Sequence, residues 1–307
     1  GITLGPACGP IWAHRDKMVV VRGMTMDTVA HEVGRRYFLT GKMPSGLTAR
    51  GSSVPTEIAA QLHGAGAPPR MPFVPNLAYA VESYNDRHPS YASGLKISSV
   101  QDLLDALVRD EGAYSEVEQR LIQDYLGRPD SFGLPLELMP SALNRARKSQ
   151  IQAEAVLAAQ LDKRLRFPQG LNLNSAAAAG LLAVQAITEN VSTCVSLRLT
   201  GSLDTHFDDW NTTQPADQQA AYEIIGQILS DLEATAYPDG SGDSWLDYTT
   251  VIAFSEFCRT PLINTRGGRD HHPVNACMLW GAGLKQGRVI GASSEVGMLT
   301  QGVDLAT

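Results

Sequence analysis

Several features that would assign this 307-residue chain to a common functional class are missing from it. There is no run of lysine or arginine and the formal net charge is −7, whereas a nucleic-acid-binding protein presents a basic face. No stretch reaches the roughly 20 apolar residues of a membrane-spanning helix, since Gly180 and Gln185 interrupt the most apolar segment, 176–187. We therefore expect neither a nucleic-acid partner nor a membrane span.

Cysteine is scarce and is not arranged as a metal or redox motif. The four cysteines show no CxxC spacing, which argues against a zinc ribbon or a thioredoxin-like protein. Cys194 and Cys277 lie in strand-like runs, where a buried thiol is the ordinary expectation. Residues 1–6 lack the basic and apolar regions of a signal peptide. The sequence also contains no internal repeat and no low-complexity tract.

What the sequence does contain is an alternation of strand-like and helical segments. Hydrophobic residues make up 43% of the chain, enough for the core of a large α/β domain. Runs rich in Val, Ile and Leu predict interior strands at 19–22, 193–199 and 249–255. Helical patterns lie between them and include a long helical cap element around 141–165. This order predicts a mainly parallel sheet flanked by helices.

The strongest strand signal, at 249–255, ends in a carboxylate at Glu256. Functional groups gather at the carboxyl ends of the strands in a parallel sheet. A buried carboxylate needs a partner, and Arg259, three residues on, offers one. Arg259 is then an internal ion-pair partner, or it is a clamp for a phosphate, sulfate or carboxylate group. Glu256 is correspondingly structural, a metal ligand or a base.

Two further groups of polar residues follow strands or lie in loops. Asp204 and His206 come after the strand at 193–199, and Asp270 and His271 follow a Gly-rich loop. Carboxylate oxygens and imidazole nitrogens suit zinc, manganese or similar ions. Each group taken alone also fits a solvated loop or a helix cap. Because adjacent histidines in an extended segment point in different directions, only one of His271 and His272 is expected to be a ligand.

Taken together, these motifs resemble the alkaline phosphatase and sulfatase superfamily. They most closely resemble one bacterial branch, the domain-of-unknown-function family fifteen-oh-one, whose members are generally exported. The motifs of the clear match, within 193–291, are Asp204-Thr205-His206, Ser255-Glu256-Phe257-Cys258-Arg259-Thr260-Pro261, Gly268-Arg269-Asp270-His271 and the Gly-rich segment 281–291. The segment 31–41 more weakly resembles the sulfatase nucleophile region: it keeps Arg35 and Leu39-Thr40-Gly41 at matching offsets. His31 then stands at the nucleophile position, where it is a nucleophile, a substrate contact, a metal ligand or an ordinary polar residue.

The resemblance implies one alkaline phosphatase-like α/β domain over 1–307 that hydrolyses phosphate or sulfate esters. The small anionic ester would be handled by one divalent ion (zinc, manganese or calcium), and the protein would be exported. The implied metal ligands are Asp204, His206, Glu256, Asp270 and His271; the implied catalytic residues are His31 and Glu256; the implied substrate-binding residues are Arg35 and Arg259.

Two departures from the superfamily pattern favour an alternative function. Phe257 stands where the superfamily places a metal-binding histidine beside the strand-end carboxylate, so a complete two-metal site is not expected. The first strand of the superfamily, with its metal-binding aspartate, is not found before Val19, and relatives continue beyond residue 307; we therefore expect both ends of the domain to be missing from this sequence. The alternative is a secreted binding or structural protein that keeps the fold without turnover.

Overall fold

The computed structural model describes residues 3–63, 74–89, 92–107, 117, 164–201 and 203–302, and the structural statements below refer to these residues. The helical elements are η1 (Pro6–Lys17), α1 (His31–Thr40), α2 (Val54–His63), α3 (Val100–Leu107), α7 (Ala176–Thr188), η4 (Asp208–Asn211), α8 (Thr213–Ala234) and α9 (Trp245–Tyr248). The strands are β1 (Met18–Thr25), β2 (Asn76–Tyr79), β3 (Leu95–Ile97), β4 (Cys194–Leu197), β5 (Thr250–Phe254), β6 (Cys258–Arg259), β7 (His271–His272), β8 (Val274–Gly281) and β9 (Arg288–Ile290).

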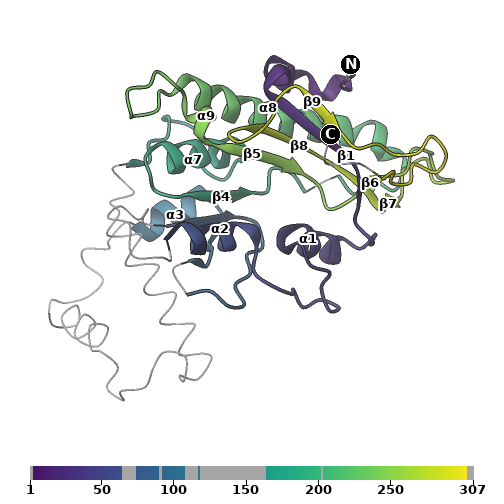
Figure 1. Cartoon of the computed structure of the whole chain (residues 1–307), viewed down its shortest axis with the longest axis horizontal. Helices are drawn as coiled ribbons and strands as arrows, with labels where there is room; N and C mark the ends of the chain where they lie inside the picture. The colour runs from purple at the N-terminus through teal and green to yellow at the C-terminus, as the bar shows by residue number, and fades with distance from the viewer. Residues whose placement is uncertain are drawn as a thin grey trace.

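The strands form a mixed sheet, a parallel sheet and a short two-stranded ribbon. The four-stranded sheet has the order β5-β8-β1-β9, in which β8 runs antiparallel to both β5 and β1, and β9 runs parallel to β1. The three-stranded sheet, β3-β2-β4, is wholly parallel, and β6 pairs with β7 in an antiparallel ribbon. Figure 1 shows α8 and the N-terminal segment on one side of the four-stranded sheet and α1, α2 and α3 on the other side of the molecule.

The predicted α/β class is confirmed, but the prediction of interior parallel strands holds only in part. Of the three predicted interior strands, only β1 has a partner on each side within the described chain. β5 and β4 are edge strands of their sheets there, and the side chains of Ile252 and Phe254 on β5 are 50% and 43% exposed. The reason is that a β-branched run signals a strand, whereas its place in the sheet depends on distant partners. An alkaline phosphatase-like topology stays a prediction, and residues 141–163 of the predicted cap helix lie outside the described residues.

Two clusters of buried side chains hold the sheets and helices together. One gathers around β2, α3 and α7 and includes Leu77, Val100 and Leu182. The other gathers around η1, α8 and β8 and includes Leu229 and the fully buried Trp280. Side chains of β4 and α7 contribute to both clusters, so the parallel sheet and the mixed sheet are packed as neighbours. No helix of the described chain is both long enough and apolar enough to cross a membrane.

The sequence predicts that Asp27, Ser99 and Ser175 each cap the start of a helix, and the structure agrees at the two serines but not at Asp27. Ser99 accepts a hydrogen bond from the backbone of α3 and Ser175 from that of α7, as expected of N-terminal caps. The helix predicted to begin after a cap at Asp27 instead begins at His31, because Asp27 adopts a left-handed backbone conformation with φ of 52°. His31 is therefore the first residue of α1.

Candidate metal centre

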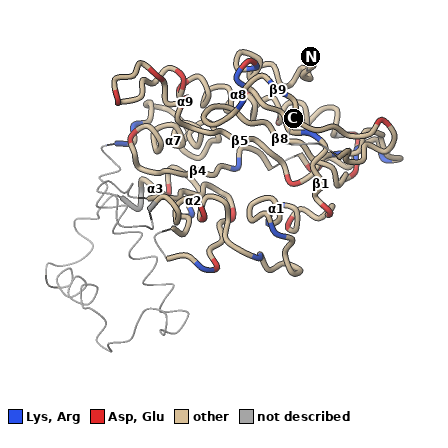
Figure 2. Tube along the Cα trace, viewed as in Figure 1, with Lys and Arg blue, Asp and Glu red and all other residues tan. Residues whose placement is uncertain are grey.

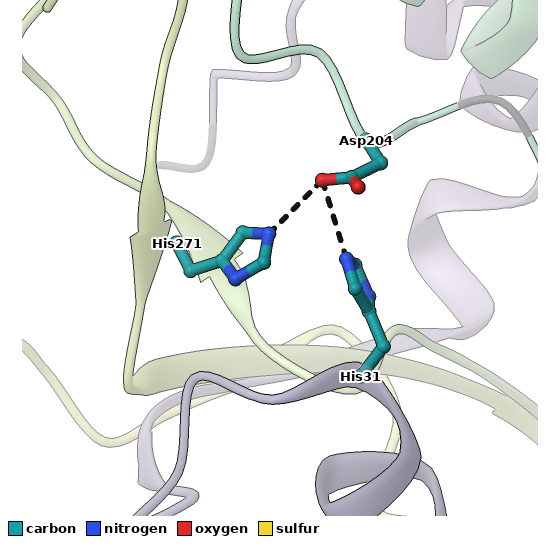
Figure 3. A group of neighbouring side chains, drawn as sticks. All are labelled: His31, Asp204 and His271. Atoms are coloured by element: carbon teal, nitrogen blue, oxygen red, sulfur yellow. Dashed lines mark hydrogen bonds and ion pairs between the residues drawn. The ribbon is translucent and has the colours of Figure 1, made fainter.

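Three segments far apart in the sequence bring one aspartate and three histidines together. Asp204 and His206 lie in the loop between β4 and η4, His31 begins α1, and His271 begins β7. Figure 3 shows the rings of His31 and His271 both pointing at the Asp204 carboxylate from different sides. One ligand atom from each of these three side chains lies within 4.8 Å of the other two, a spacing at which they can hold a metal ion.

The three imidazole rings present their Nε2 atoms to the same carboxylate oxygen. Oδ1 of Asp204 lies 2.9 Å from Nε2 of His271, 2.9 Å from Nε2 of His206 and 3.2 Å from Nε2 of His31. The Nε2 atoms of His206 and His271 are also 2.9 Å from each other. The histidine side chains are 18–25% exposed and that of Asp204 is 49% exposed. The group is thus open to solvent on the carboxylate side.

On the far side of each ring, Nδ1 faces a hydrogen-bond acceptor. The acceptor is Glu256 Oε1 for His31, Asp270 Oδ1 at 2.7 Å for His206, and the backbone carbonyl of Val29 at 2.6 Å for His271. Since these acceptors carry no proton to donate in their usual charged or carbonyl forms, Nδ1 is the protonated nitrogen in each ring. In a neutral imidazole the lone pair then lies on Nε2, facing Asp204.

With neutral imidazole rings, these contacts fit a cation better than they fit hydrogen bonding alone. The Nε2 atom of His31 is buried and has no hydrogen-bond partner, although it lies near Asp204. The Nε2 atoms of His206 and His271 face each other, where two lone pairs do not attract, and the donor near them is Nη1 of Arg259, 3.3 Å from Nε2 of His206. Two nitrogens bound to the same tetrahedral zinc ion at about 2.0–2.1 Å lie about 3.3 Å apart, so the 2.9 Å between these two atoms needs to widen only slightly to admit an ion. The outer acceptors match the carboxylates and carbonyls that orient metal-binding histidines.

Arg259 is directed at the carboxylate of this group. Its Nη2 donates to Asp204 Oδ1 at 2.5 Å, and its Nη1 donates to the Arg269 carbonyl at 3.2 Å. Burial alone would raise the pKa of the Asp204 carboxyl, but hydrogen bonds from His271, Arg259 and His31, in which a protonated Nε2 of each ring is the donor, hold it well below its usual range. Asp204 is therefore an anion at neutral pH. The partner of Arg259 is Asp204 and not Glu256, which the sequence had offered as one alternative.

The loop that carries Asp270 is fastened to the loop that carries His206. Asn264 Nδ2 donates to Asp270 Oδ1 at 3.0 Å and to the His206 carbonyl at 3.1 Å. The His206 contact, followed by that of Asn264, lowers the pKa of the Asp270 carboxyl. Gly268 makes the approach possible, since a methyl group there would lie 2.1 Å from the His206 carbonyl carbon. The Gly-rich loop thus sets the distance between Asp270 and His206.

The segment that carries Glu256 is also packed closely against α1. A methyl group on Gly34 would lie 3.0 Å from Cβ of Glu256. The buried ring of Phe257 lies against two site histidines, with its centroid 4.9 Å from that of His31 and 4.4 Å from that of His271. An apolar ring therefore closes one side of the group.

A comparison with protein families identifies the chain at this point. The family model described as Protein of unknown function (DUF1501) matches residues 1–304. The chain belongs to this family. No curated protein and no solved structure gives a significant match. The match extends over the N-terminal half, including α1. The wider resemblance to the alkaline phosphatase and sulfatase superfamily is untested by this match and stays a prediction.

In this DUF1501 chain, some predicted site residues meet directly and others lie behind the histidine rings. Their roles stay predictions. Asp204, His206 and His271 meet directly, and His31 joins them. Glu256 and Asp270, predicted as ligands, contact Nδ1 atoms behind the rings. His272, expected to differ from His271, turns away and contacts the Gly297 carbonyl at 3.1 Å.

Arg35, predicted to bind substrate, forms ion pairs with two glutamates. Within the described part of the chain it makes no hydrogen bond or ion pair with Asp204. These ion pairs, with Glu32 at 3.6 Å and Glu82 at 3.9 Å, exceed hydrogen-bond length. Sequence reasoning missed three contributors to the site: the carbonyl of Val29, the amide of Asn264 and the close approach at Gly34. Of these three, only Gly34 could have been recognised in the sequence. Glycine destabilises the interior of a helix, so its presence there indicates close packing against another segment.

Proposed function

We propose that this protein is a metal-dependent hydrolase of phosphate or sulfate esters. The observation that supports the proposal is the arrangement around Asp204. Three imidazole Nε2 atoms face its Oδ1 at 2.9–3.2 Å, and that of His31 is buried without a hydrogen-bond partner. The resemblance to the alkaline phosphatase and sulfatase superfamily supports the choice of reaction, and phosphate and sulfate esters are its substrate class.

The donor set favours one borderline metal over a hard one. His31, Asp204 and His271 would hold the ion, with His206 at the same carboxylate oxygen. Calcium, magnesium and manganese prefer oxygen ligands, whereas imidazole suits zinc, so the nitrogen-rich set favours zinc over manganese or calcium. When bound, such an ion supplies Lewis-acid chemistry and polarises a phosphoryl or sulfuryl oxygen.

We assign different roles to the two arginines, Arg259 and Arg35. Arg259 is occupied by Asp204 and by the Arg269 carbonyl, and we assign it to holding the carboxylate in place. Arg35 lies one helical turn beyond His31 on the same face of α1. Its side chain is 34% exposed and its ion pairs are long. Its guanidinium donors are thus the ones available to the ester anion.

A second candidate is a metal-binding protein without turnover. Two observations favour it. The ring of Phe257 covers one side of the group, and the guanidinium of Arg259 is paired with Asp204 and is therefore not available to a substrate anion. Acidic and basic positions are interspersed along the described trace in Figure 2, so the charge pattern does not decide between the two functions.

Metal content and ester hydrolysis distinguish the two candidates. The purified protein is assayed for zinc and manganese and then for release of a chromogenic leaving group from phosphate and sulfate esters. His271→Ala is the test variant, and His272→Ala is its matched control, because the two residues are adjacent but only His271 faces Asp204. We expect turnover that is lost in His271→Ala and kept in His272→Ala. Bound metal with equal background rates in both variants and the wild type would favour the binding protein.

A further inference from the structure

We infer that Glu256 and Asp270 are positioning residues that orient His31 and His206, and are not themselves metal ligands. This inference departs from the ligand set that the sequence predicts. It rests on the metal-binding part of the proposed function and is independent of ester hydrolysis. The central observation is that both carboxylates contact a ring at Nδ1, whereas the atoms that face Asp204 are the Nε2 atoms.

Glu256 lies behind His31 with respect to the group. Its Oε1 contacts Nδ1 of His31, while Nε2 of the same ring lies 3.2 Å from Asp204 Oδ1. The imidazole ring therefore separates this carboxylate oxygen from the aspartate. A carboxylate in this position fixes which nitrogen carries the proton, sets the angle of the ring and raises the basicity of the other nitrogen.

Asp270 stands in the same relation to His206. Its Oδ1 lies 2.7 Å from Nδ1 of His206, and the opposite nitrogen of that ring lies 2.9 Å from Asp204. Asn264 and Arg266 donate to the same oxygen at 3.0 and 3.3 Å. These three contacts hold the carboxylate oxygen at the back of the His206 ring, away from Asp204.

The backbone around both carboxylates is held firmly enough for this role. Asp270 exchanges hydrogen bonds with Thr260: its carbonyl accepts from the Thr260 amide at 2.8 Å, and its amide donates to Thr260 Oγ1 at 3.1 Å. Glu256 is held by the close approach of Gly34. The third ring, His271, is oriented by a backbone carbonyl, which substitution cannot remove. Glu256 and Asp270 are thus the side chains through which the orientation can be tested.

The test compares an amide and an apolar replacement at each position. Cobalt(II) serves as the probe ion: its affinity is measured by competition with a chelator, and its visible absorption reports the coordination. The variants are Glu256→Gln, Glu256→Leu, Asp270→Asn and Asp270→Leu, with His271→Ala as the ligand-loss comparator. An amide oxygen still accepts a hydrogen bond from Nδ1, whereas leucine does not.

We expect the amide variants to bind cobalt within about tenfold of the wild type and the leucine variants about 10–100-fold more weakly. All four should keep the wild-type absorption spectrum. The inference would be overturned by amide variants that bind cobalt as weakly as His271→Ala, or whose absorption spectrum differs from that of the wild type as the spectrum of His271→Ala does. This comparison needs only the amide variants, so it holds even if the leucine variants do not fold. A wild type that binds cobalt but hydrolyses no ester would overturn only the hydrolase. A wild type that binds no cobalt, zinc or manganese would overturn both.

Discussion

Replacing Gly268 by alanine should disrupt the candidate metal centre without altering any charge or polar side chain. The added methyl group would lie 2.1 Å from the His206 carbonyl carbon and 2.2 Å from the Phe207 nitrogen. Both neighbours are backbone atoms, so neither can move aside by changing a rotamer, and the two loops must separate. The hydrogen bond from the Arg269 amide to the Thr205 carbonyl, now 3.1 Å, is the first contact to be lost.

The magnitude follows from crowding and from the lost contacts. Overpacking costs about 1–3 kcal/mol and a lost backbone hydrogen bond about 0.5–1.5 kcal/mol. The free energy of unfolding in a urea titration should therefore fall by about 2–4 kcal/mol. Separating the loops also draws Asp270 away from Nδ1 of His206, so metal affinity should fall about 10–100-fold.

Gly9→Ala is the matched control for Gly268→Ala. Gly9 has nothing within 4 Å of an added methyl group and no left-handed backbone conformation, so this change should alter the free energy of unfolding by no more than about 0.5 kcal/mol. If Gly268→Ala matches the wild type in both urea midpoint and metal affinity, the two loops do not approach each other as described.

Three further substitutions test separate parts of the structure. His271→Ala should weaken zinc binding by more than about 100-fold, since removing a supporting residue alone costs about 10–100-fold, and His272→Ala should leave it unchanged; equal losses in a chelator competition would contradict the assignment. Arg259→Lys should also weaken zinc binding, because an ammonium cannot hold both Asp204 and a backbone carbonyl as the guanidinium does; wild-type affinity would show that Asp204 needs no such support. Burial raises the pKa of the Cys194 thiol to about 11 from 9.0, so between those pH values the unfolded chain loses a proton that the folded chain keeps. The free energy of unfolding should therefore fall by up to about 1.4 kcal/mol per pH unit over that window, and a Cys194→Ala variant that shows the same fall would refute this cause.

The local chemistry of the chain was readable from its sequence. The runs that form β1, β4 and β5, the serine caps of α3 and α7, and the polar residues that follow the strands are each encoded within a few neighbouring positions. The motifs also led to the family that the comparison then showed over residues 1–304. Such features are local because strand propensity, capping and ligand chemistry depend on side chains close in the sequence.

The position of each strand in its sheet, and of each side chain in the site, is determined by contacts between residues far apart in the sequence. β5 reads as an interior strand, yet in the described chain it lies at the edge of its sheet, because the position of a strand depends on which partners reach it. Glu256 and Asp270 have the same chemistry as Asp204, and the sequence predicted all three as ligands. Only the folded chain separates them: it places Asp204 at the Nε2 atoms and the other two at the Nδ1 atoms. Which nitrogen of a ring a carboxylate meets depends on the packing at Gly34 and Gly268, and that packing joins segments more than 50 residues apart in the sequence.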